Sequence, residues 1–491
     1  MTTFQTGAEA REIARQRAQQ LAQAMLPAIE AMMTEGRTAA EIIAEERGVS
    51  APNYAHATPI VAAYGDGAYV VDVEGNRYLD CITGYSTRPF GFVGGEDGAA
   101  MEVAAAIAAQ MITLSITSRA YFTETLPPFL GAICDVTGFG AAGRVLPSSG
   151  GAEAVETAIQ MTFAWAKQHK GIEDPVIIVA DGNFHGRTSR IKTLAGQEDY
   201  DDYKRIGYVH DDMRAHVLHV PYGDAEALHE LLEQEYIGAD GKPHKNRDRV
   251  AGFLVEPIQG ERGIYVPDPG YLYQLAELAA QEDIMVIFDE IQTGLGRTGK
   301  MLAIHHELPS REERPDLWKH IAVILGKGLG GGFVPSSAVI ADEEVMQVME
   351  SGSHGSTNGG NPLAAAAGVK TLELLAENGY VENAARLGHK LKLGLELMGE
   401  RYPGVFKDVR GKGLLIGVEI DPAFAAADEL NDALLKNGLL SKVTHGKTLR
   451  IAPPLNITEK EVGEILARFE LAVMDVARDK GVEFPPQIAR L

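Results

Sequence analysis

The sequence predicts an α/β protein with helices flanking a large, mostly parallel sheet, together with a smaller α+β domain. Short continuous apolar runs recur along the chain, as expected of strands buried on both faces. They lie at 176–180, 251–255, 285–288 and 322–325. A helical segment at 271–282, introduced by Asp268-Pro269-Gly270, separates the second run from the third. Such a βαβ unit requires parallel strands with the helix on one face of the sheet.

We expect four segments along the chain. Residues 1–50 form a helical N-terminal extension, because apolar residues recur there near helical spacing with almost no turn residues. Residues 51–105 contribute to the small domain, and their strands at 68–72 and 77–80 form a hairpin around a glycine–asparagine turn. The other two segments are the large domain at 106–360 and the C-terminal small domain at 361–491.

The C-terminal segment mixes helical and strand patterns, which is typical of an α+β domain. Its expected helices lie at 363–377, 382–398 and 458–478, and its strands lie at 414–419 and 449–451. Earlier in the chain, the polar stretch 238–249 is expected to be a surface loop.

Composition excludes several classes of function. The 491 residues include 45 basic and 68 acidic side chains, a formal charge of -23, which argues against binding nucleic acid. Two cysteines, Cys81 and Cys134, cannot form a disulfide framework and favour a reducing compartment. We see neither a membrane-spanning run nor a secretory signal. The sequence therefore predicts a cytoplasmic enzyme that acts on small molecules.

One glycine-rich motif has a rival interpretation. Residues 294–300 (GLGRTGK) match the dinucleotide pattern and most of a P-loop, but Met301 stands where a P-loop needs serine or threonine. Several residues also separate this motif from the preceding strand, so a nucleotide-binding enzyme is only the alternative. The histidines at 305–306 lack a third ligand at the spacing of a zinc site, and we expect no metal.

A separate set of residues predicts cofactor chemistry. Asp289 ends one buried strand, and Lys327 follows another within a glycine-rich loop, where α/β sheets bind ligands. The sequence SSGGAE (148–153) precedes a helix at 154–167, whose free N–H groups form an anion site. The glycine-rich loop 354–360 supplies further hydroxyl and amide groups. A lysine, a buried acid and a phosphate cradle are the groups that pyridoxal phosphate requires.

With these motifs in place, the chain resembles the class III (ω-) aminotransferases, pyridoxal-phosphate enzymes of fold type I, and among them most closely the ornithine aminotransferases. The resemblance extends from about residue 53 to residue 472. The segments that carry it are VEPIQGERG (255–263), DEIQTGLGRTGKMLA (289–303), LGKGLGGG (325–332), HGSTNGGNPLA (354–364), VRGKGLLIG (409–417) and GLLSKVTHGKTLRIAPPL (438–455).

The resemblance implies roles for residues around the cofactor. Lys327 matches the Schiff-base lysine that also moves the substrate proton, and Asp289 matches the partner of the pyridine nitrogen. Gln292 matches the residue near the phenolic oxygen, and Phe184 matches the aromatic ring stacked on the cofactor.

Further matches concern the phosphate and the quaternary structure. Gly151 and Ala152 match the phosphate-binding amides. Thr357 matches a hydroxyl that reaches the phosphate of the neighbouring subunit, which implies a homodimer with shared active sites. A higher oligomer built from such dimers is the alternative.

Five other residues match substrate contacts. Arg450 corresponds to the arginine that holds the carboxylate of 2-oxoglutarate, and Glu261 to the carboxylate that covers it while the amine donor is bound. Tyr54, Tyr85 and Arg187 match positions that hold the α-amino and α-carboxyl end of ornithine. The implied reaction is a ping-pong transfer that yields glutamate and glutamate semialdehyde, which cyclises to pyrroline-5-carboxylate.

The sequence departs from the ornithine pattern at four places. Residues 91–96 replace a Gly-His-x-His-Pro stretch, and His185 stands where tryptophan is usual. Asn358 replaces a tyrosine, and Gly150 replaces a threonine. These changes leave lysine, a polyamine or another ω-amine as alternative donors. A decarboxylase or racemase on the same scaffold, which would need no Glu261–Arg450 pair, is a further alternative.

Overall fold

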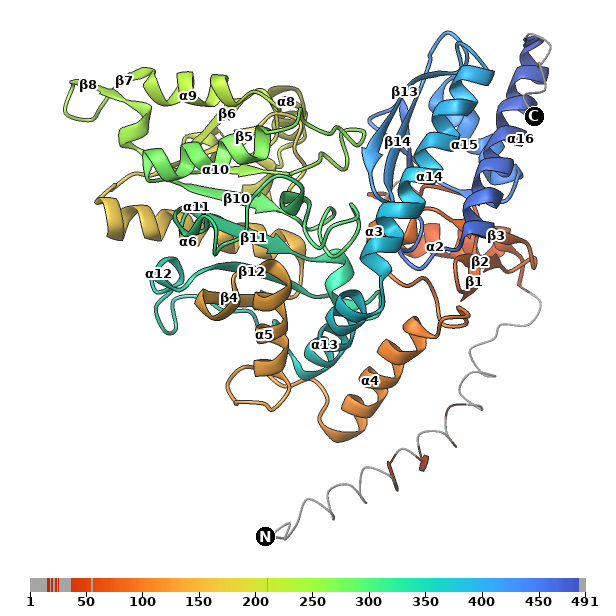
Figure 1. Ribbon diagram of the computed structural model, residues 1–491, viewed down its shortest axis with the longest axis horizontal. Coiled ribbons are helices and arrows are strands. Elements are labelled where there is room, and N and C mark those ends of the chain that lie inside the picture. Colours follow the sequence, from red (N-terminus) through yellow and green to blue (C-terminus); the bar gives the residue numbers. More distant parts are fainter. Residues whose placement is uncertain are drawn as a thin grey trace.

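A computed structural model describes residues 16–17, 19–20, 23, 25, 37–53, 56–209 and 211–484. Figure 1 shows a large sheet with helices on both faces, beside smaller sheets covered by α14, α15 and α16. Of the predicted N-terminal extension, α2 (Ala39–Val49) is helical, and Thr38 caps it by accepting a hydrogen bond from the Glu41 N–H. Most of the rest of that extension lies outside the described residues.

The large sheet has seven strands in the order β4-β12-β11-β10-β9-β5-β6. β12 runs antiparallel to both of its neighbours, β11 and β4, and all other neighbouring pairs in this sheet are parallel. The strands are β4 (Gly143–Ser148), β12 (Ser337–Asp342), β11 (Ile321–Leu325), β10 (Met285–Asp289), β9 (Val250–Val255), β5 (Val176–Ala180) and β6 (Val217–Val220). This mostly parallel sheet confirms the predicted α/β fold class, and each of the four predicted apolar runs is a strand.

The apolar runs are continuous because the sheet is covered on both faces. Along β10, Val286 and Phe288 belong to one hydrophobic cluster, whereas Met285 and Ile287 belong to a second cluster across the sheet. Helix α10 (Tyr271–Glu282) has the predicted bounds. Helix α6 (Gly151–Lys170) begins three residues before the predicted helix, because its first turn includes the glycine-rich segment.

Two smaller sheets accompany the large one. The first has the antiparallel order β13-β14-β17-β16, with β13 (Phe406–Lys412), β14 (Leu415–Ile420), β17 (Thr448–Ile451) and β16 (Lys442–Thr444). The second joins β1 (Ala62–Asp66), β2 (Tyr69–Asp72) and β3 (Arg77–Asp80) to β15 (Leu439–Leu440). Because β3 pairs with β15, residues near position 80 lie beside the C-terminal part of the chain.

The helices over the smaller sheets are α14 (Tyr380–Arg401), α15 (Ala427–Lys436) and α16 (Glu459–Lys480), and Thr458, the first residue of the predicted last helix, is the N-cap of α16. The remaining helices are α3 (Thr83–Ser86), α4 (Ala99–Thr113), α5 (Leu126–Thr137), α7 (Ser189–Lys192), α8 (Gln197–Ile206), α9 (Ala225–Glu233), α11 (Pro315–Trp318), α12 (Glu343–Met346) and α13 (Pro362–Glu377). Within the described ranges, no helix has the length and apolar character needed to cross a bilayer.

The expectation of a surface loop at 238–249 was too simple. The polar stretch 238–249 is not wholly irregular, because β7 (Glu235–Ile237) pairs with β8 (Pro243–Lys245) in a short hairpin. Asp240 stabilises the turn by accepting hydrogen bonds from the Lys242 N–H (3.1 Å) and the His244 ring (3.0 Å). Pairing between the two short strands satisfies backbone polar groups of this stretch, so a polar sequence did not exclude regular structure.

Candidate active site

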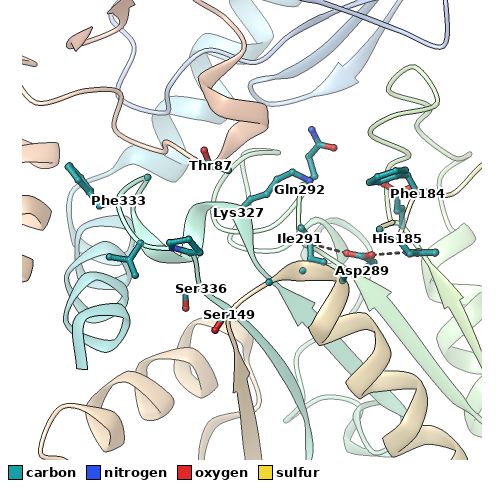
Figure 2. Close-up of a pocket in the computed structure, with 18 residues that line it drawn as sticks. Thr87, Ser149, Phe184, His185, Asp289, Ile291, Gln292, Lys327, Phe333 and Ser336 are labelled. Atoms are coloured by element: carbon teal, nitrogen blue, oxygen red, sulfur yellow. Dashed lines mark hydrogen bonds and ion pairs between the residues drawn. The ribbon is translucent and has the colours of Figure 1, made fainter. Parts of the chain in front are cut away.

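Asp289 and Lys327 meet at the carboxyl edge of the large sheet. Asp289 ends β10 and lies opposite Ile324 of the parallel strand β11. Lys327 follows β11 and opens the 3-10 turn η5 (Lys327–Gly330) with a left-handed φ of 38°. Figure 2 shows both side chains at one cavity, which has a volume of about 470 Å³. This edge is where parallel sheets place their ligands.

The cavity favours a reactive amine. Burial lowers the pKa of the Lys327 ammonium, and the carboxylates of Glu261 and Asp289 oppose that shift only in part. A lowered pKa makes more of the neutral amine available, and the neutral amine is the form that acts as a nucleophile or base.

Asp289 is buried and fixed on two sides. Its Oδ2 lies 2.7 Å from His185 Nδ1, and its Oδ1 accepts a hydrogen bond from the Ile291 N–H at 3.1 Å. Only 4% of Asp289 and 5% of His185 is exposed, so water does not screen the pair. The carboxylate is therefore oriented before any ligand arrives.

The first turn of α6 forms an anion cradle. No side chain caps this helix, and its N-cap is Gly150. The carboxylate of Glu153 accepts from the N–H groups of Ser149 (2.8 Å) and Gly150 (3.3 Å), and the N–H groups that follow are left for a ligand. A Cβ on Gly151 would come within 3.0 Å of Ile291, so glycine keeps the cradle open.

Phe184 and Gln292 complete the lining that the sequence predicts. Figure 2 shows Phe184 above His185, on the Asp289 side of the cavity. The Gln292 amide nitrogen is buried and has no hydrogen-bond partner among the described residues, so it is available to a bound group. A Cβ built on Gly260 would lie 1.9 Å from Gln292 Oε1, which shows how closely the side chain packs against that backbone.

These groups fit pyridoxal phosphate. The cavity combines a neutralisable lysine, a buried carboxylate for the pyridine nitrogen, an aromatic ring and an uncapped helix terminus for the phosphate. The unpartnered Gln292 amide supplies one more donor.

Arg450 and Glu261 form an ion pair close to this cavity, in which the Arg450 side chain is buried and 31% of the Glu261 side chain is exposed. Arg450 lies on β17, and its Nη1 is 2.6 Å from Glu261 Oε1. Its side chain is 1% exposed, and its Nε and Nη2 have no partner among the described residues. Burial raises the pKa of Glu261, but Arg450 outweighs this and lowers the pKa overall. These two guanidinium nitrogens can therefore donate to a further acceptor.

The structure places the other predicted residues unevenly. Tyr85 lies with its ring centre 5.0 Å from the Arg450 guanidinium carbon, and the Arg187 guanidinium carbon lies 5.8 Å from the Phe184 ring centre. Thr357 is exposed and does not line this cavity, and Tyr54 lies outside the described residues.

Sequence reasoning missed Glu256, which lines the same cavity. Its carboxylate accepts hydrogen bonds from the N–H groups of Phe184 (2.7 Å) and Gly260 (3.1 Å). Burial raises the pKa of Glu256 to about 7, although His185 opposes the shift. The available signal was its position directly after β9, which parallels the position of Asp289 in the neighbouring strand. Thr87, Phe333 and Ser336 also line the cavity without having been predicted.

The glycine-rich stretch 294–300 does not form a nucleotide site. It is almost wholly buried and is followed by turns and a short 3-10 segment, η4 (Ala303–His306), instead of a helix. A Cβ on Gly299 would lie 2.8 Å from Ala385 of α14. These glycines allow close packing, and no helix terminus points from the loop toward a phosphate.

Comparison with known proteins gives a consistent result. The model of the class-III aminotransferase family matches residues 49–473. The mitochondrial ornithine aminotransferase of Oryza sativa subsp. japonica is 37% identical over 88% of this chain and 85% of its own length. The ornithine aminotransferase of Bacillus subtilis (strain 168) is 38% identical over 88% and 96%. An ornithine aminotransferase structure from Toxoplasma gondii, with pyridoxal phosphate at partial occupancy, has a TM-score of 0.80 at 33% identity and covers 91% and 96%.

Proposed function

The chain belongs to the class-III aminotransferases, and from this premise we propose that it transfers the δ-amino group of L-ornithine to 2-oxoglutarate. The enzyme is a pyridoxal-phosphate-dependent transaminase. The observation that carries the choice of substrates is the ion pair between the buried Arg450 and the half-buried Glu261, beside Tyr85. The names of the relatives from Oryza sativa and Bacillus subtilis support ornithine as the donor.

Residues on the cofactor side would hold pyridoxal phosphate. Asp289 would hold the pyridine nitrogen, Phe184 would cover the ring, Gln292 would reach the phenolic oxygen, and the amides of Gly151 and Ala152 would bind the phosphate. When bound, the cofactor withdraws electrons from the substrate carbon that carries the amine. We further propose that residues 106–360 form this cofactor-binding domain. Residues 51–105 and 361–491 would form the small domain, which the pairing of β3 with β15 supports.

Lys327 would move the proton. Because burial lowers its pKa, the Nζ atom can take a proton from the substrate carbon and return it nearby.

Arg450 and Glu261 would let one pocket accept two substrates. While the donor is bound, Glu261 neutralises Arg450, so the distal amino group of the donor does not meet an exposed cation. When 2-oxoglutarate enters, Glu261 moves away, and the guanidinium binds the keto acid's carboxylate through two parallel hydrogen bonds. The unpartnered Nε and Nη2 atoms of Arg450 supply this second interaction.

The working unit would be a homodimer in the cytoplasm. A set of exposed apolar side chains near the end of α4 supports burial against a second copy, comprising Met111, Leu114, Ile116, Tyr121 and Phe122. The exposed Thr357 would then reach the phosphate of the partner subunit. Cys81 and Cys134 are free and buried, in keeping with a reducing compartment. Sedimentation at several protein concentrations tests the dimer.

The function is tested by titrating the holoenzyme with amines while following the visible absorbance of the cofactor. L-Ornithine should remove the absorbance of the aldehyde form and release pyrroline-5-carboxylate, and 2-oxoglutarate should restore it. A response to L-lysine or putrescine but not to L-ornithine would retain the transaminase and reject ornithine. If L-ornithine removes the absorbance but 2-oxoglutarate does not restore it, 2-oxoglutarate is rejected as the acceptor.

A further inference from the structure

A left-handed turn lies beside the Arg450–Glu261 pair. The four residues of α3 (Thr83–Ser86) have φ angles between 47° and 70°. Hydrogen bonds from Ser86 N to Ile82 O (3.2 Å) and from Thr87 N to Thr83 O (3.0 Å) close it with helical spacing. Left-handed conformations are unfavourable for residues with a Cβ and normally occur singly. Four in succession, three of them not glycine, require support from the surrounding structure.

Asp80 supplies part of that support from the end of β3. Its Oδ1 accepts hydrogen bonds from the N–H groups of Ile82 (2.8 Å) and Thr83 (2.9 Å), and its Oδ2 pairs with Arg88. Asp80 is 3% exposed, so these bonds form away from water. One carboxylate therefore organises the entry to the turn and its exit.

Thr83 fastens the turn to the strand that carries Arg450. The Thr83 hydroxyl donates to the carbonyl oxygen of Ala452 at 2.9 Å, and the Ala452 N–H donates to Cys81 O at 2.9 Å. Ala452 directly follows β17, two residues after Arg450. Thr83 is 1% exposed, so the loss of its hydroxyl would leave a buried carbonyl without this partner.

The turn also faces the reacting lysine. A Cβ built on Gly328, the residue after Lys327, would lie 3.8 Å from the carbonyl oxygen of Ser86. On the substrate side, the turn directs the Tyr85 ring onto Arg450, whose Nη1 donates a hydrogen bond to Glu261. Between them, the ring and the carboxylate cover the guanidinium.

We infer that the left-handed turn is a specificity-determining device and that Asp80 and Thr83 are positioning residues that hold Tyr85 against Arg450. This inference rests on the proposed function, since it concerns how the donor and the keto acid share one arginine. A fixed Tyr85 ring keeps Arg450 covered while the donor is bound. If the turn is loosened, the positive charge of Arg450 is uncovered and repels the donor's distal amino end. This weakens donor binding more than it weakens keto-acid binding.

The test uses Thr83→Val in the holoenzyme, which keeps the shape and β-branching of the residue and removes only the hydroxyl. We expect KM for L-ornithine to rise about 5- to 10-fold, the loss of one buried hydrogen bond. The kcat and the KM for 2-oxoglutarate should stay within about twofold, and Thr83→Ser should restore donor binding. Thr137→Val is the matched control, because the Thr137 hydroxyl is also buried and donates to a carbonyl, Ile133 O at 2.7 Å, within α5.

Two outcomes would overturn the inference. One is an equal rise in both KM values, and the other is a loss of stability like that of Thr137→Val with no change in KM. If Thr83→Val does not fold, Gly84→Ala tests the same turn, because its Cβ would lie 2.6 Å from Thr87 Oγ1 at a φ of 59°. If the wild-type enzyme rejects ornithine, the proposed function fails by itself. The donor-against-acceptor comparison is then made with the amine that the enzyme accepts.

Discussion

The cofactor side and the substrate side of the proposed active site are built in different ways. On the cofactor side, Asp289 ends β10, Lys327 follows β11, and the phosphate cradle opens α6, so a single sheet positions every group. On the substrate side, Arg450 lies on β17 of a smaller sheet, Glu261 follows β9, and Tyr85 occupies a left-handed turn. Those groups meet only through contacts between elements far apart in the chain.

This difference matches the tasks of the two sides. The cofactor remains bound through both half-reactions, and a hydrogen-bonded sheet with apolar clusters on both faces keeps its partners still. The substrate side must accept two molecules in turn, and an ion pair can be broken and remade. Changes on the cofactor side should therefore affect both half-reactions, and changes on the substrate side should affect one.

The largest effect is expected for Lys327→Ala. The variant should lose at least about a thousandfold in the rates of both half-reactions, because Lys327 is the group proposed to move the proton. Single-turnover absorbance measurements with L-ornithine and with 2-oxoglutarate check this. Lys300→Ala is the control, since Lys300 is an exposed lysine in a glycine-rich loop and should behave as wild type. Normal turnover by Lys327→Ala would refute the whole assignment of the site.

Arg450→Ala should separate the two sides most clearly. We expect a loss of about a hundredfold in kcat/KM for 2-oxoglutarate, the usual cost of removing a charge-assisted fork, and a smaller loss for the donor. Stopped-flow rates for each half-reaction measure the difference. Arg450→Lys, which keeps the charge without the fork, should recover only part of the loss. Equal losses in both half-reactions would contradict the proposed role of Arg450.

Gly260→Ala tests how tightly the cofactor side is packed. The new Cβ would lie 1.9 Å from Gln292 Oε1, so the Gln292 side chain must move. We expect cofactor affinity to fall about tenfold, as measured by dialysis and absorbance, with similar effects on both half-reactions. Gly131→Ala is the control, because a Cβ there meets nothing within 4 Å. Unchanged affinity would show that Gln292 does not contribute to holding the cofactor.

The smallest effect concerns pH and stability. Burial raises the pKa of Glu290 to about 7 from an ordinary 4.5. The folded carboxyl thus binds its proton more tightly than the unfolded one. The contribution of the protonated Glu290 carboxyl to the stability of the fold is therefore complete below pH 4.5, and it is lost as the pH rises to about 7.

Glu290→Gln should therefore lose less stability than wild type between pH 5 and pH 8, a difference of a few degrees in Tm. Glutamine can still accept from the Ile304 N–H, which donates to Glu290 Oε1 at 2.9 Å. Thermal unfolding followed by circular dichroism measures this, with the exposed Glu350→Gln as control. Parallel Tm curves for Glu290→Gln and wild type would show that Glu290 does not titrate in this way.

The same division separates what the sequence predicts from what it misses. Lys327, Asp289 and the first turn of α6 each follow a strand or begin a helix, so a local pattern places them at the sheet edge. Glu256 also follows a strand, yet only the structure reveals its burial and its bonds to Phe184 and Gly260. On the substrate side, the roles of Glu261 and Arg450 came from resemblance, because nothing local links two residues 189 positions apart.

By itself the sequence determined the α/β class, four of the seven strands of the large sheet, and the positions of Lys327 and Asp289 at strand ends. Hydrophobic periodicity and strand ends are local properties of the sequence. The strands of a parallel sheet buried on both faces are continuous apolar runs, so a short stretch of sequence is enough to recognise them. Only the tertiary structure decided that the glycine-rich loop 294–300 packs against α14 and that residues 83–86 turn left-handed. Both outcomes depend on long-range contacts, the fit of Gly299 to Ala385 and the bond from Thr83 to Ala452, that no short stretch of sequence encodes.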